Sequence, residues 1–505
     1  MKDRGLPRSP TCIPGLDTLL GGGVLTGGIY IIQGAPGAGK TILANQICFG
    51  AAATGGRALY VTLLAESHAR MIGHLGAFSF FDPNRVPDQV TYLSGFKTLE
   101  EDGLKGLVDM LRREIRSRQA TTLVLDGLVS AEETATSPRE LKKFIHELQT
   151  QAGLTDCTMF LLTSAYTGQR MVSAEHTMVD GLIELQNRSY GRRSDRELQV
   201  HKFRGGPMLG GVHSYVINDH GVQVYPRIEA LYAKPTYLDD ADGPQIDTGV
   251  GLLNEMMGGG PSRHSMTLLL GPAGIGKSTV GLQFLGGGGK SEPGLYFSFN
   301  ESPRSIAVKA KGLKLPVVDL IESGHVGVLW NPVTEGVVDA VCDSLLEIVR
   351  KRGVRRLFID GIDGFAKLAS EQGRVGPLLT ALSNELRSRS VSTFSTAEMD
   401  LAGIVPGQPL AGLSVRDMSP VADNIVLMRF VGTRSQLHRL IAVLKVREAR
   451  TSLQFRRYRI EEGGLLIESD ASAAERLLGG FSSMSDGAQA LSPAAAAPDQ
   501  LGRGD

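Results

Sequence analysis

Two short segments of this 505-residue chain carry the residue types that bind the phosphates of a nucleotide. The first reads GAPGAGKT at 34–41, and the second reads GPAGIGKS at 271–278. Glycine adopts positive φ and leaves room for an anion near the backbone, so successive N–H groups can point at one phosphate. The lysine then contacts the β- and γ-phosphate oxygens, and the hydroxyl after it ligates Mg²⁺. The pattern predicts two sites for ATP with Mg²⁺ rather than two glycine-rich turns. The predicted phosphate-binding residues are Gly34, Gly37, Gly39, Lys40, Thr41, Gly271, Gly274, Gly276, Lys277 and Ser278.

One aspartate in each half of the chain fits the magnesium side of such a site. Asp126 ends the apolar run of TTLVLDGL and Asp360 ends that of RRLFIDGI, each about 85 residues after the loop lysine. A carboxylate at the end of a strand beside the loop can hold Mg²⁺, often through water. An aspartate that only caps a turn is the alternative, but its recurrence at one spacing favours the magnesium role. The predicted metal ligands are Thr41, Asp126, Ser278 and Asp360.

Hydrolysis of ATP also needs a group that orients or activates water. Glu66 in YVTLLAES and Glu301 in YFSFNESP each follow the strand that comes after the loop helix. These two glutamates are the predicted catalytic residues. A solvated glutamate at the end of a strand remains the competing interpretation of both.

The two halves of the chain repeat one order of features. In each half, three glycines and a short apolar run precede the loop, and the aspartate and a Lys-x-Arg stretch follow it. The Lys-x-Arg stretches are VHKFRGG, with Lys202, and VLKVREA, with Lys445. Landmarks in one order and at nearly one spacing indicate a tandem duplication.

Apolar runs and amphipathic stretches alternate within each half. The runs RALYVTLL and CTMFLLTSA are continuous, as in strands that are buried on both faces. Stretches such as GLVDMLRREIRSRQA and AVCDSLLEIVRKRG read as helices. This alternation predicts an α/β protein in which each half forms a mostly parallel, twisted sheet with helices on both faces. We place a first domain at 1–230, a linker at 231–243, a second domain at 244–467 and a flexible tail rich in Ala, Ser, Gly and Pro at 468–505.

The composition is that of a globular protein without a bias for nucleic acid. Lys plus Arg and Asp plus Glu both number 53, and 42% of the residues are apolar. A chain without net positive charge lacks the general electrostatic footprint for phosphate backbones. The four cysteines form no CxxC pair. The N-terminal residues have no apolar signal core, and no apolar run approaches the roughly 20 residues that span a bilayer. We therefore expect a cytoplasmic protein that binds neither membranes nor nucleic acid.

Several of these stretches together resemble the KaiC family of RecA-like ATPases in its two-domain form. The resemblance covers about 8–465 and rests on IPGLDTLLGGG, both phosphate loops, FNESP, ADNIVLMRF and the two Lys-x-Arg stretches. It implies two tandem RecA-like P-loop NTPase domains, and homohexamers that bind ATP between neighbouring subunits. It also implies that the Lys-x-Arg cations contact the neighbour's γ-phosphate, where such cations stabilise developing charge. The residues concerned are Lys202, Arg204, Lys445 and Arg447. Outside this context, a solvated basic strand would be the simpler interpretation.

The catalytic position departs from the pattern of this family. The family has two adjacent glutamates there, whereas this chain has Asn300–Glu301 in the second half and Ala65–Glu66 in the first. One carboxylate is therefore missing from each pair. The first half departs further from the family pattern, because its alignment also needs one extra residue after YVT.

The phosphorylation region departs as well. The family phosphorylates itself at a Ser–Thr pair shortly before the stretch that corresponds to ADNIVLMRF. Ser419 matches the serine, but Pro420 stands at the threonine and has no hydroxyl. Ser414 matches a nearby third hydroxyl. Ser419 and Ser414 are the candidate phosphorylation sites, and a plain turn before Pro420 is the alternative.

The sequence as a whole predicts an ATPase that forms hexamers and acts in signalling or timing, and it leaves serine/threonine autokinase activity of the second domain open. One alternative is a non-catalytic scaffold or switch that ATP holds together. The other is a RecA-like ATPase of DNA recombination or repair. The signalling role depends on the resemblance, and it would bring in a regulatory protein partner at the C-terminal tail.

Overall fold

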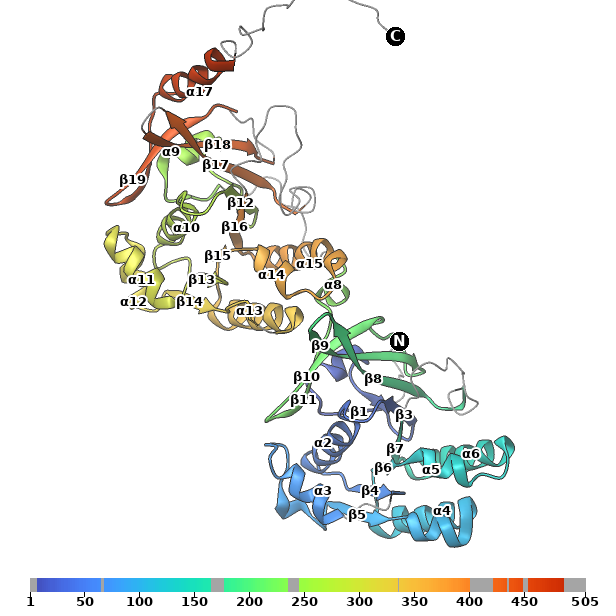
Figure 1. Cartoon of the computed structure of the whole chain (residues 1–505). Coiled ribbons are helices and arrows are strands. Elements are labelled where there is room, and N and C mark those ends of the chain that lie inside the picture. Colours follow the sequence, from blue (N-terminus) through green and yellow to red (C-terminus); the bar gives the residue numbers. More distant parts are fainter. Residues whose placement is uncertain are drawn as a thin grey trace, which may run out of the picture. The chain divides into compact units, whose positions relative to one another are not determined.

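A computed structural model provides the fold of the chain (Figure 1). The residues that it describes are 7–64, 68–164, 177–234, 245–334, 336–399, 421–433, 436–447 and 453–485. By their internal contacts, the residues fall into two compact units, Met1–Ala233 and Lys234–Asp505, and each is described by itself.

The first unit is built on a nine-stranded sheet with the order β11-β10-β9-β8-β3-β7-β6-β4-β5. The strands from β8 to β5 run parallel, and β9, β10 and β11 extend the sheet by antiparallel pairing. These strands are β3 (Ile29–Gly34), β4 (Ala58–Thr62), β5 (Val90–Ser94), β6 (Thr122–Asp126), β7 (Thr158–Thr163), β8 (Gly181–Tyr190), β9 (Arg193–Phe203), β10 (Val212–Asn218) and β11 (Gly221–Tyr225). The helices are α1 (Leu16–Leu19), α2 (Lys40–Ala53), α3 (His68–Leu75), α4 (Phe96–Arg118), α5 (Leu128–Thr134), α6 (Pro138–Thr155) and α8 (Ile228–Leu231). Strands β1 (Arg8–Ser9) and β2 (Val24–Leu25) form a separate pair.

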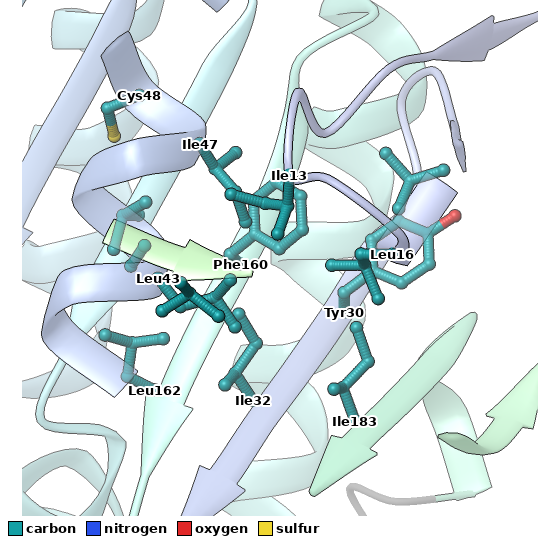
Figure 2. Packing of buried hydrophobic residues seen from close by; sticks show 14 of the residues in the cluster. Ile13, Leu16, Tyr30, Ile32, Leu43, Ile47, Cys48, Phe160, Leu162 and Ile183 are labelled. Carbon is teal, nitrogen blue, oxygen red and sulfur yellow. The ribbon is translucent and has the colours of Figure 1, made fainter. Parts of the chain in front are cut away.

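Both faces of the central strand β3 are buried, which explains its continuous apolar run. Tyr30 and Ile32 pack with residues of α2 on one face, and Ile31 packs with residues of α4, α5 and α6 on the other. Figure 2 shows the first of these clusters, where Leu43 and Ile47 of α2 meet side chains of the sheet. Because burial of apolar area is the main favourable term in folding, these two layers fix β3 and the loop that follows it.

The second unit has a nine-stranded sheet with the order β14-β13-β15-β16-β12-β17-β18-β19-β20. Its strands are β12 (Met266–Gly271), β13 (Gly294–Ser298), β14 (Val326–Trp330), β15 (Arg356–Asp360), β16 (Ser392–Glu398), β17 (Asn424–Thr433), β18 (Gln436–Lys445), β19 (Arg456–Glu461) and β20 (Gly464–Ile467). Its helices are α9 (Gly251–Met256), α10 (Lys277–Gly286), α11 (Pro303–Gly312), α12 (Val317–Glu322), α13 (Val338–Arg352), α14 (Asp363–Leu368), α15 (Val375–Ser388) and α17 (Ser472–Ser485).

The two sheets share one topology, strand for strand. In the second unit the parallel set runs from β17 to β14, and β18, β19 and β20 pair antiparallel beyond it. Phe284 of α10 stacks on Phe394 of β16, with ring centroids 4.1 Å apart, and both pack with Leu269 of β12. Figure 1 shows helices on both faces of each sheet. The predicted fold class is confirmed: each half is a mostly parallel sheet with flanking helices, consistent with a RecA-like domain.

The predicted linker and tail are only partly described. Helix α8 ends at Leu231, the first residue of the predicted linker, and 235–244 are outside the described residues. The segment predicted as a flexible tail begins with helix α17, whose Ala474 is buried against Val431 and Leu440. The residues 486–505 are again outside the described part. The proposed domain limits therefore stay predictions.

Among the described residues, no helix combines the length and apolar character that crossing a membrane requires. Three of the cysteines, Cys48, Cys157 and Cys342, are buried thiols, and Cys12 is exposed.

Candidate nucleotide-binding sites

Each predicted phosphate loop lies between the central strand of its sheet and a helix. β3 ends at Gly34 and α2 begins at Lys40, while β12 ends at Gly271 and α10 begins at Lys277. Both strands belong to the parallel set, so the loops emerge at the carboxyl edge, where open α/β sheets bind ligands. The N-terminus of the helix adds backbone N–H groups and the positive end of its dipole, which favour an anion.

Glycine is required where the two loops enter their helices. Gly39 and Gly276 have φ of 95° and 114°, in the left-handed region that side chains with a Cβ rarely adopt. Earlier in the loops, a Cβ on Gly37 or Gly274 would meet no atom within 4 Å. No atom therefore blocks the Cβ direction at these two glycines. In the first unit Arg196 Nη1 donates to the Gly37 carbonyl at 3.0 Å.

The loop lysines point into their own loops. Lys40 Nζ donates to the Gly34 carbonyl and Lys277 Nζ donates to the Gly271 carbonyl, both at 2.6 Å. Burial lowers the pKa of both lysines, and the charge of Asp126 opposes this shift for Lys40. A partly desolvated ammonium that is held by carbonyl oxygens favours an anion beside it.

The Asp360 carboxylate stands at the centre of a hydrogen-bonded group in the second unit. Its Oδ2 accepts from Ser278 Oγ at 3.1 Å and from the Tyr296 hydroxyl at 2.6 Å. Its Oδ1 accepts from Thr396 Oγ1 at 2.9 Å. Asp360 is only 6% exposed. The structure thus brings together the hydroxyl and the carboxylate that we predicted as magnesium ligands in this half.

Asp126 occupies the same place in the first unit but has different neighbours. Its Oδ2 accepts from the Tyr60 hydroxyl at 2.5 Å, and burial together with the Asp126 charge raises the pKa of Tyr60. The strand position that pairs with Asp126 is Leu162, which corresponds to Thr396 and packs in the apolar cluster of Figure 2. A leucine cannot donate to the carboxylate. Thr41 lies in the first turn of α2, as Ser278 does in α10.

The predicted catalytic glutamate of the second unit is engaged by two side chains. Glu301 forms an ion pair with Lys309 of α11, and its Oε2 accepts from Ser305 Oγ at 3.3 Å. The Glu301 charge also contributes to the raised pKa of Tyr296, whose hydroxyl donates to Asp360. Glu301 therefore lies within electrostatic range of the predicted magnesium side of the site.

Three predicted residues cannot be placed. Glu66, Ser414 and Ser419 lie outside the described residues. Their catalytic and phosphorylation roles therefore rest on the sequence alone.

Two acidic residues beside the second loop were not predicted. Glu398 ends β16 at the position that pairs with Gly271, and its N–H donates to Asp363 Oδ2 at 3.1 Å. Both carboxylates oppose the lowering of the Lys277 pKa, with Glu398 the strongest of the nearby acids. Glu398 is the last residue of the stretch VSTFSTAE, which contains β16. Since parallel strands end at one edge of a sheet, that strand's last residue could have been identified as a neighbour of the loop.

The Lys-x-Arg stretch of the first unit lies away from its own loop. Lys202 pairs with Leu182 of β8, which in turn pairs with Ile31 of β3. Ile31 precedes Gly34 by three residues, a separation of about 10 Å along a strand. Lys202 Nζ donates to the Thr177 carbonyl at 2.7 Å. The lysine is thus held toward the amino edge of the sheet, opposite the loop.

The second unit repeats this arrangement. Lys445 pairs with Ile425, which pairs with Leu268, again three residues before Gly271. Lys445 Nζ donates to the Ala422 carbonyl at 2.7 Å. In both units the pairing of the two strands shifts register beside the lysine, an irregularity that re-aims side chains.

The loops and their neighbours fit a nucleoside triphosphate with Mg²⁺. A partly desolvated lysine lies in each loop. The Ser278 hydroxyl and the Asp360 carboxylate are oxygen donors of the kind that Mg²⁺ prefers. The described residues hold no group of three His, Cys, Asp or Glu side chains that could bind a metal ion by itself. A magnesium ion here would take its other ligands from phosphates and water.

Comparison with known proteins agrees with this geometry. The family model described as "ATPase: KaiC" matches residues 9–229 and 246–472. The chain is 23% identical over 492 residues to the circadian clock oscillator protein KaiC of Picosynechococcus sp., covering 94% of this chain and 92% of that protein. It is 24% identical over 487 residues to the protein of the same name from Thermostichus vulcanus, covering 93% and 91%. It is 22% identical over 484 residues to the circadian clock protein KaiC3 of Synechocystis sp., covering 92% of each chain.

Proposed function

The chain belongs to the KaiC family of ATPases, and from this premise we propose that it hydrolyses ATP at two sites per chain, in a homohexamer whose sites are completed by the neighbouring subunit. One observation carries the proposal. In each unit the Lys-x-Arg cations lie toward the edge of the sheet opposite the loop of the same unit.

Geometry supports completion of each site by a second chain. Lys202 and Lys445 are each about 10 Å along the sheet from the last residue of the loop strand. Their ammonium groups bind the carbonyls of Thr177 and Ala422, which lie at the amino edge. A lysine or arginine placed there cannot contact a phosphate on its own loop. It can contact the phosphate of a neighbour when subunits pack head to tail, as the closed rings of homo-oligomers do.

Within one site, the chain's own residues divide the work. Backbone N–H groups of the loop and the lysine, Lys40 or Lys277, bind the phosphates of ATP. In the second unit, Ser278 and Asp360 would hold Mg²⁺, which neutralises charge on the phosphates; Thr41 and Asp126 are their counterparts. Cations from the neighbour would stabilise the charge of the transferring phosphoryl group.

Water activation falls to Glu301, and to Glu66 in the first unit. Glu301 is held by Lys309, so the carboxylate has to leave this ion pair, or act at its edge, to accept a proton from water. A single carboxylate is sufficient for this role if it reaches the attacking water. Asn300, beside it, supplies an amide that cannot accept the proton.

A second candidate function applies to the first unit. Leu162 replaces the hydroxyl that supports the second unit's aspartate, and Ala65 stands at one catalytic position. These differences favour a first unit that binds ATP chiefly to hold the ring together, with slow turnover. The chain as a whole would then act as a switch in signalling or timing, with a protein partner that reads the C-terminal tail.

Autokinase activity is a separate proposal. Ser419, with Ser414 nearby, is the candidate acceptor, whereas Pro420 removes the second acceptor of the family's pair. Incubation with γ-labelled ATP followed by peptide mapping tests it. Label on Ser419 supports the activity, and an unlabelled chain under conditions of active ATP turnover contradicts it.

Size-exclusion chromatography with light scattering, with and without Mg²⁺-ATP, tests the main proposal. We expect hexamers with Mg²⁺-ATP that release phosphate, and we expect a variant with both Lys40→Ala and Lys277→Ala to lose both properties. A monomer that is indifferent to ATP would contradict the ring.

A further inference from the structure

An aspartate in each unit links the loop strand to the Lys-x-Arg stretch. Asp423 precedes β17 in the second unit, and Asp180 precedes β8 in the first. Neither aspartate belongs to a phosphate loop. Both lie at the amino edge of their sheet, where the cations of the Lys-x-Arg stretch also lie.

Asp423 joins three segments that are far apart in the sequence. Its N–H donates to the Met266 carbonyl at 2.9 Å, and the Met266 N–H donates back to Asp423 Oδ2 at 2.9 Å. The Arg447 N–H donates to the Asp423 carbonyl at 3.1 Å, and Arg447 Nη1 donates to Oδ1 at 2.9 Å. Arg387 Nη2 donates to Oδ2 at 2.6 Å. The first residue of β12 and the guanidinium of Arg447 therefore share one carboxylate.

The first unit repeats the backbone part of this arrangement. The Asp180 N–H donates to the Ile29 carbonyl at 2.8 Å, and the Ile29 N–H donates to Asp180 Oδ2 at 3.0 Å. The Arg204 N–H donates to the Asp180 carbonyl at 2.8 Å, and Arg204 Nη1 lies 3.8 Å from Asp180 Oδ1. The two units therefore share the backbone bonds of the aspartate and its bond to the first residue of the loop strand. The guanidinium contacts differ, because Arg204 Nη2 and Nη1 donate to the carbonyls of Thr177 and Met178 at 3.0 and 3.4 Å.

The exposures of the two arginines differ in the second unit. Asp423 is 5% exposed, and a buried carboxylate needs a charged partner. The side chain of Arg387, 13% exposed, supplies one, whereas that of Arg447 is 52% exposed. One buried arginine already neutralises the aspartate. Neutralising Asp423 therefore does not require the second, half-exposed arginine. The contact is better explained if the carboxylate orients the guanidinium of Arg447.

We infer that Asp423 is a positioning residue that holds the guanidinium of Arg447 in the orientation in which it serves the neighbouring chain's ATP. This inference rests on the proposed function. A planar guanidinium with one nitrogen fixed on a carboxylate has a defined direction for its other donors. If the guanidinium is already oriented before the neighbouring subunit docks, its side-chain entropy does not have to be lost when the transition state forms.

Asp423 is itself attached to β12, the strand that leads into the second phosphate loop. β12 begins at Met266, which Asp423 holds, and ends at Gly271, whose carbonyl accepts from Lys277. Arg447 is therefore fixed relative to the same rigid strand that carries its own chain's phosphate loop. In the first unit, backbone carbonyls rather than the carboxylate hold the Arg204 guanidinium. We therefore expect substitution of Asp180 to have a smaller effect than substitution of Asp423.

Steady-state ATP hydrolysis by the full-length hexamer tests the inference. We expect Asp423→Asn to assemble with Mg²⁺-ATP, to keep the KM for ATP, and to lower kcat by about tenfold, as loss of one oriented contact does. Arg447→Ala should lower kcat at least as much. The double variant should be no slower than Arg447→Ala alone, because a residue that acts only through Arg447 has nothing left to position.

Arg387→Met is the matched control, since it removes the other arginine from the same carboxylate. It should leave kcat within about twofold of the parent. An equal loss of kcat in Arg387→Met, or multiplicative losses in the double variant, would mean that Asp423 acts on stability alone and would overturn the inference.

The outcomes separate the inference from the proposed function. If Arg447→Ala retains full turnover, completion of the site by the neighbour fails, and the positioning role fails with it. If Arg447→Ala is slow but Asp423→Asn is not, only the positioning role fails. Should Asp423→Asn not fold, Arg447→Lys takes its place. It keeps the charge but not the planar donor, so a lowered kcat supports orientation as the requirement and full turnover refutes it.

Discussion

The two units have the same strand order and the same loop geometry, yet they surround the strand-end aspartate differently. Asp360 accepts from the hydroxyls of Ser278, Tyr296 and Thr396. In the first unit Leu162 stands where Thr396 does, and it packs in the apolar cluster. The predicted phosphate loops of the two units therefore share one geometry, while the surroundings of the predicted magnesium ligands differ.

The acidic surroundings of the two loops diverged too. Beside the second loop, Glu398 and Asp363 act on Lys277. By strand register, Ser164 follows the strand that corresponds to β16, so no carboxylate stands at that position in the first unit. Because the scaffold and the loop are shared, such differences are the place to look for unequal turnover by the two units.

Removal of one loop lysine should give the largest effect and tests whether the units are unequal. We expect Lys277→Ala to lower turnover at the second site by about 10²–10³-fold, because an electrostatic contact to the transferring phosphoryl group is lost. Total phosphate release should then fall to the level of the first unit. Lys40→Ala should instead weaken the ATP-dependent hexamer and leave the second site's chemistry intact.

Phosphate release and light scattering on the two variants check this. If Lys40→Ala abolishes most of the turnover while Lys277→Ala spares it, the first unit is the faster enzyme. That result would contradict the proposal that the second unit carries most of the turnover.

The catalytic glutamates give the next largest contrast. Glu301→Gln should reduce second-site turnover by about 10²-fold or more, because an amide cannot accept a proton from water. The hexamer should persist, since ATP binding does not need this carboxylate. Glu66→Gln in the first unit should change total turnover much less. Equal losses in both variants would show that the two units hydrolyse ATP at similar rates.

The ion pair of Glu301 with Lys309 sharpens this prediction. Removing the cation in Lys309→Met should change second-site kcat if the pair holds Glu301 in place. Single-turnover phosphate release from the assembled hexamer measures it. An unchanged rate in Lys309→Met beside a large loss in Glu301→Gln would show that the pair is structural only.

The sequence predicted the layout of these sites better than their internal bonds. Continuous apolar runs predicted the strand, loop and helix around Lys40 and Lys277, because both depend on residues close together in the chain. The contacts of Asp423 with Met266 and Arg447 depend on register between distant strands, and sequence periodicity does not specify register across such separations. The pairing of Glu301 with Lys309 was missed because side-chain partners are chosen by packing, not by pattern.

A smaller effect concerns the hydroxyl that distinguishes the two aspartates. Thr396→Val removes the donor to Asp360 Oδ1 and the acceptor of the Gly361 N–H. Loss of a buried hydrogen bond to a charged group alone costs about 1.5–3 kcal/mol of unfolding free energy. Thr393→Val on the same strand is the matched control. Within the described part of the chain, the buried Thr393 hydroxyl has no hydrogen-bond partner. Its replacement should therefore be neutral or stabilising.

Denaturant unfolding of both threonine variants measures the contrast. Equal destabilisation by Thr396→Val and Thr393→Val would mean that the hydrogen bonds of the Thr396 hydroxyl, including the one to Asp360, contribute nothing beyond packing. The difference between the two magnesium sides would then lose its energetic basis.

Complementation between two inactive chains tests most directly whether the sites are completed by the neighbour. Lys277→Ala lacks its own second loop but keeps Arg447, and Arg447→Ala lacks the cation but keeps its loop. An equal mixture is assembled with Mg²⁺-ATP, and the turnover of a chain that carries both substitutions is subtracted. In mixed head-to-tail rings, about a quarter of the second sites should have an intact loop facing an intact arginine. Completion in trans predicts recovery of about that fraction of parental second-site turnover, whereas a mixture no faster than its two components would contradict it.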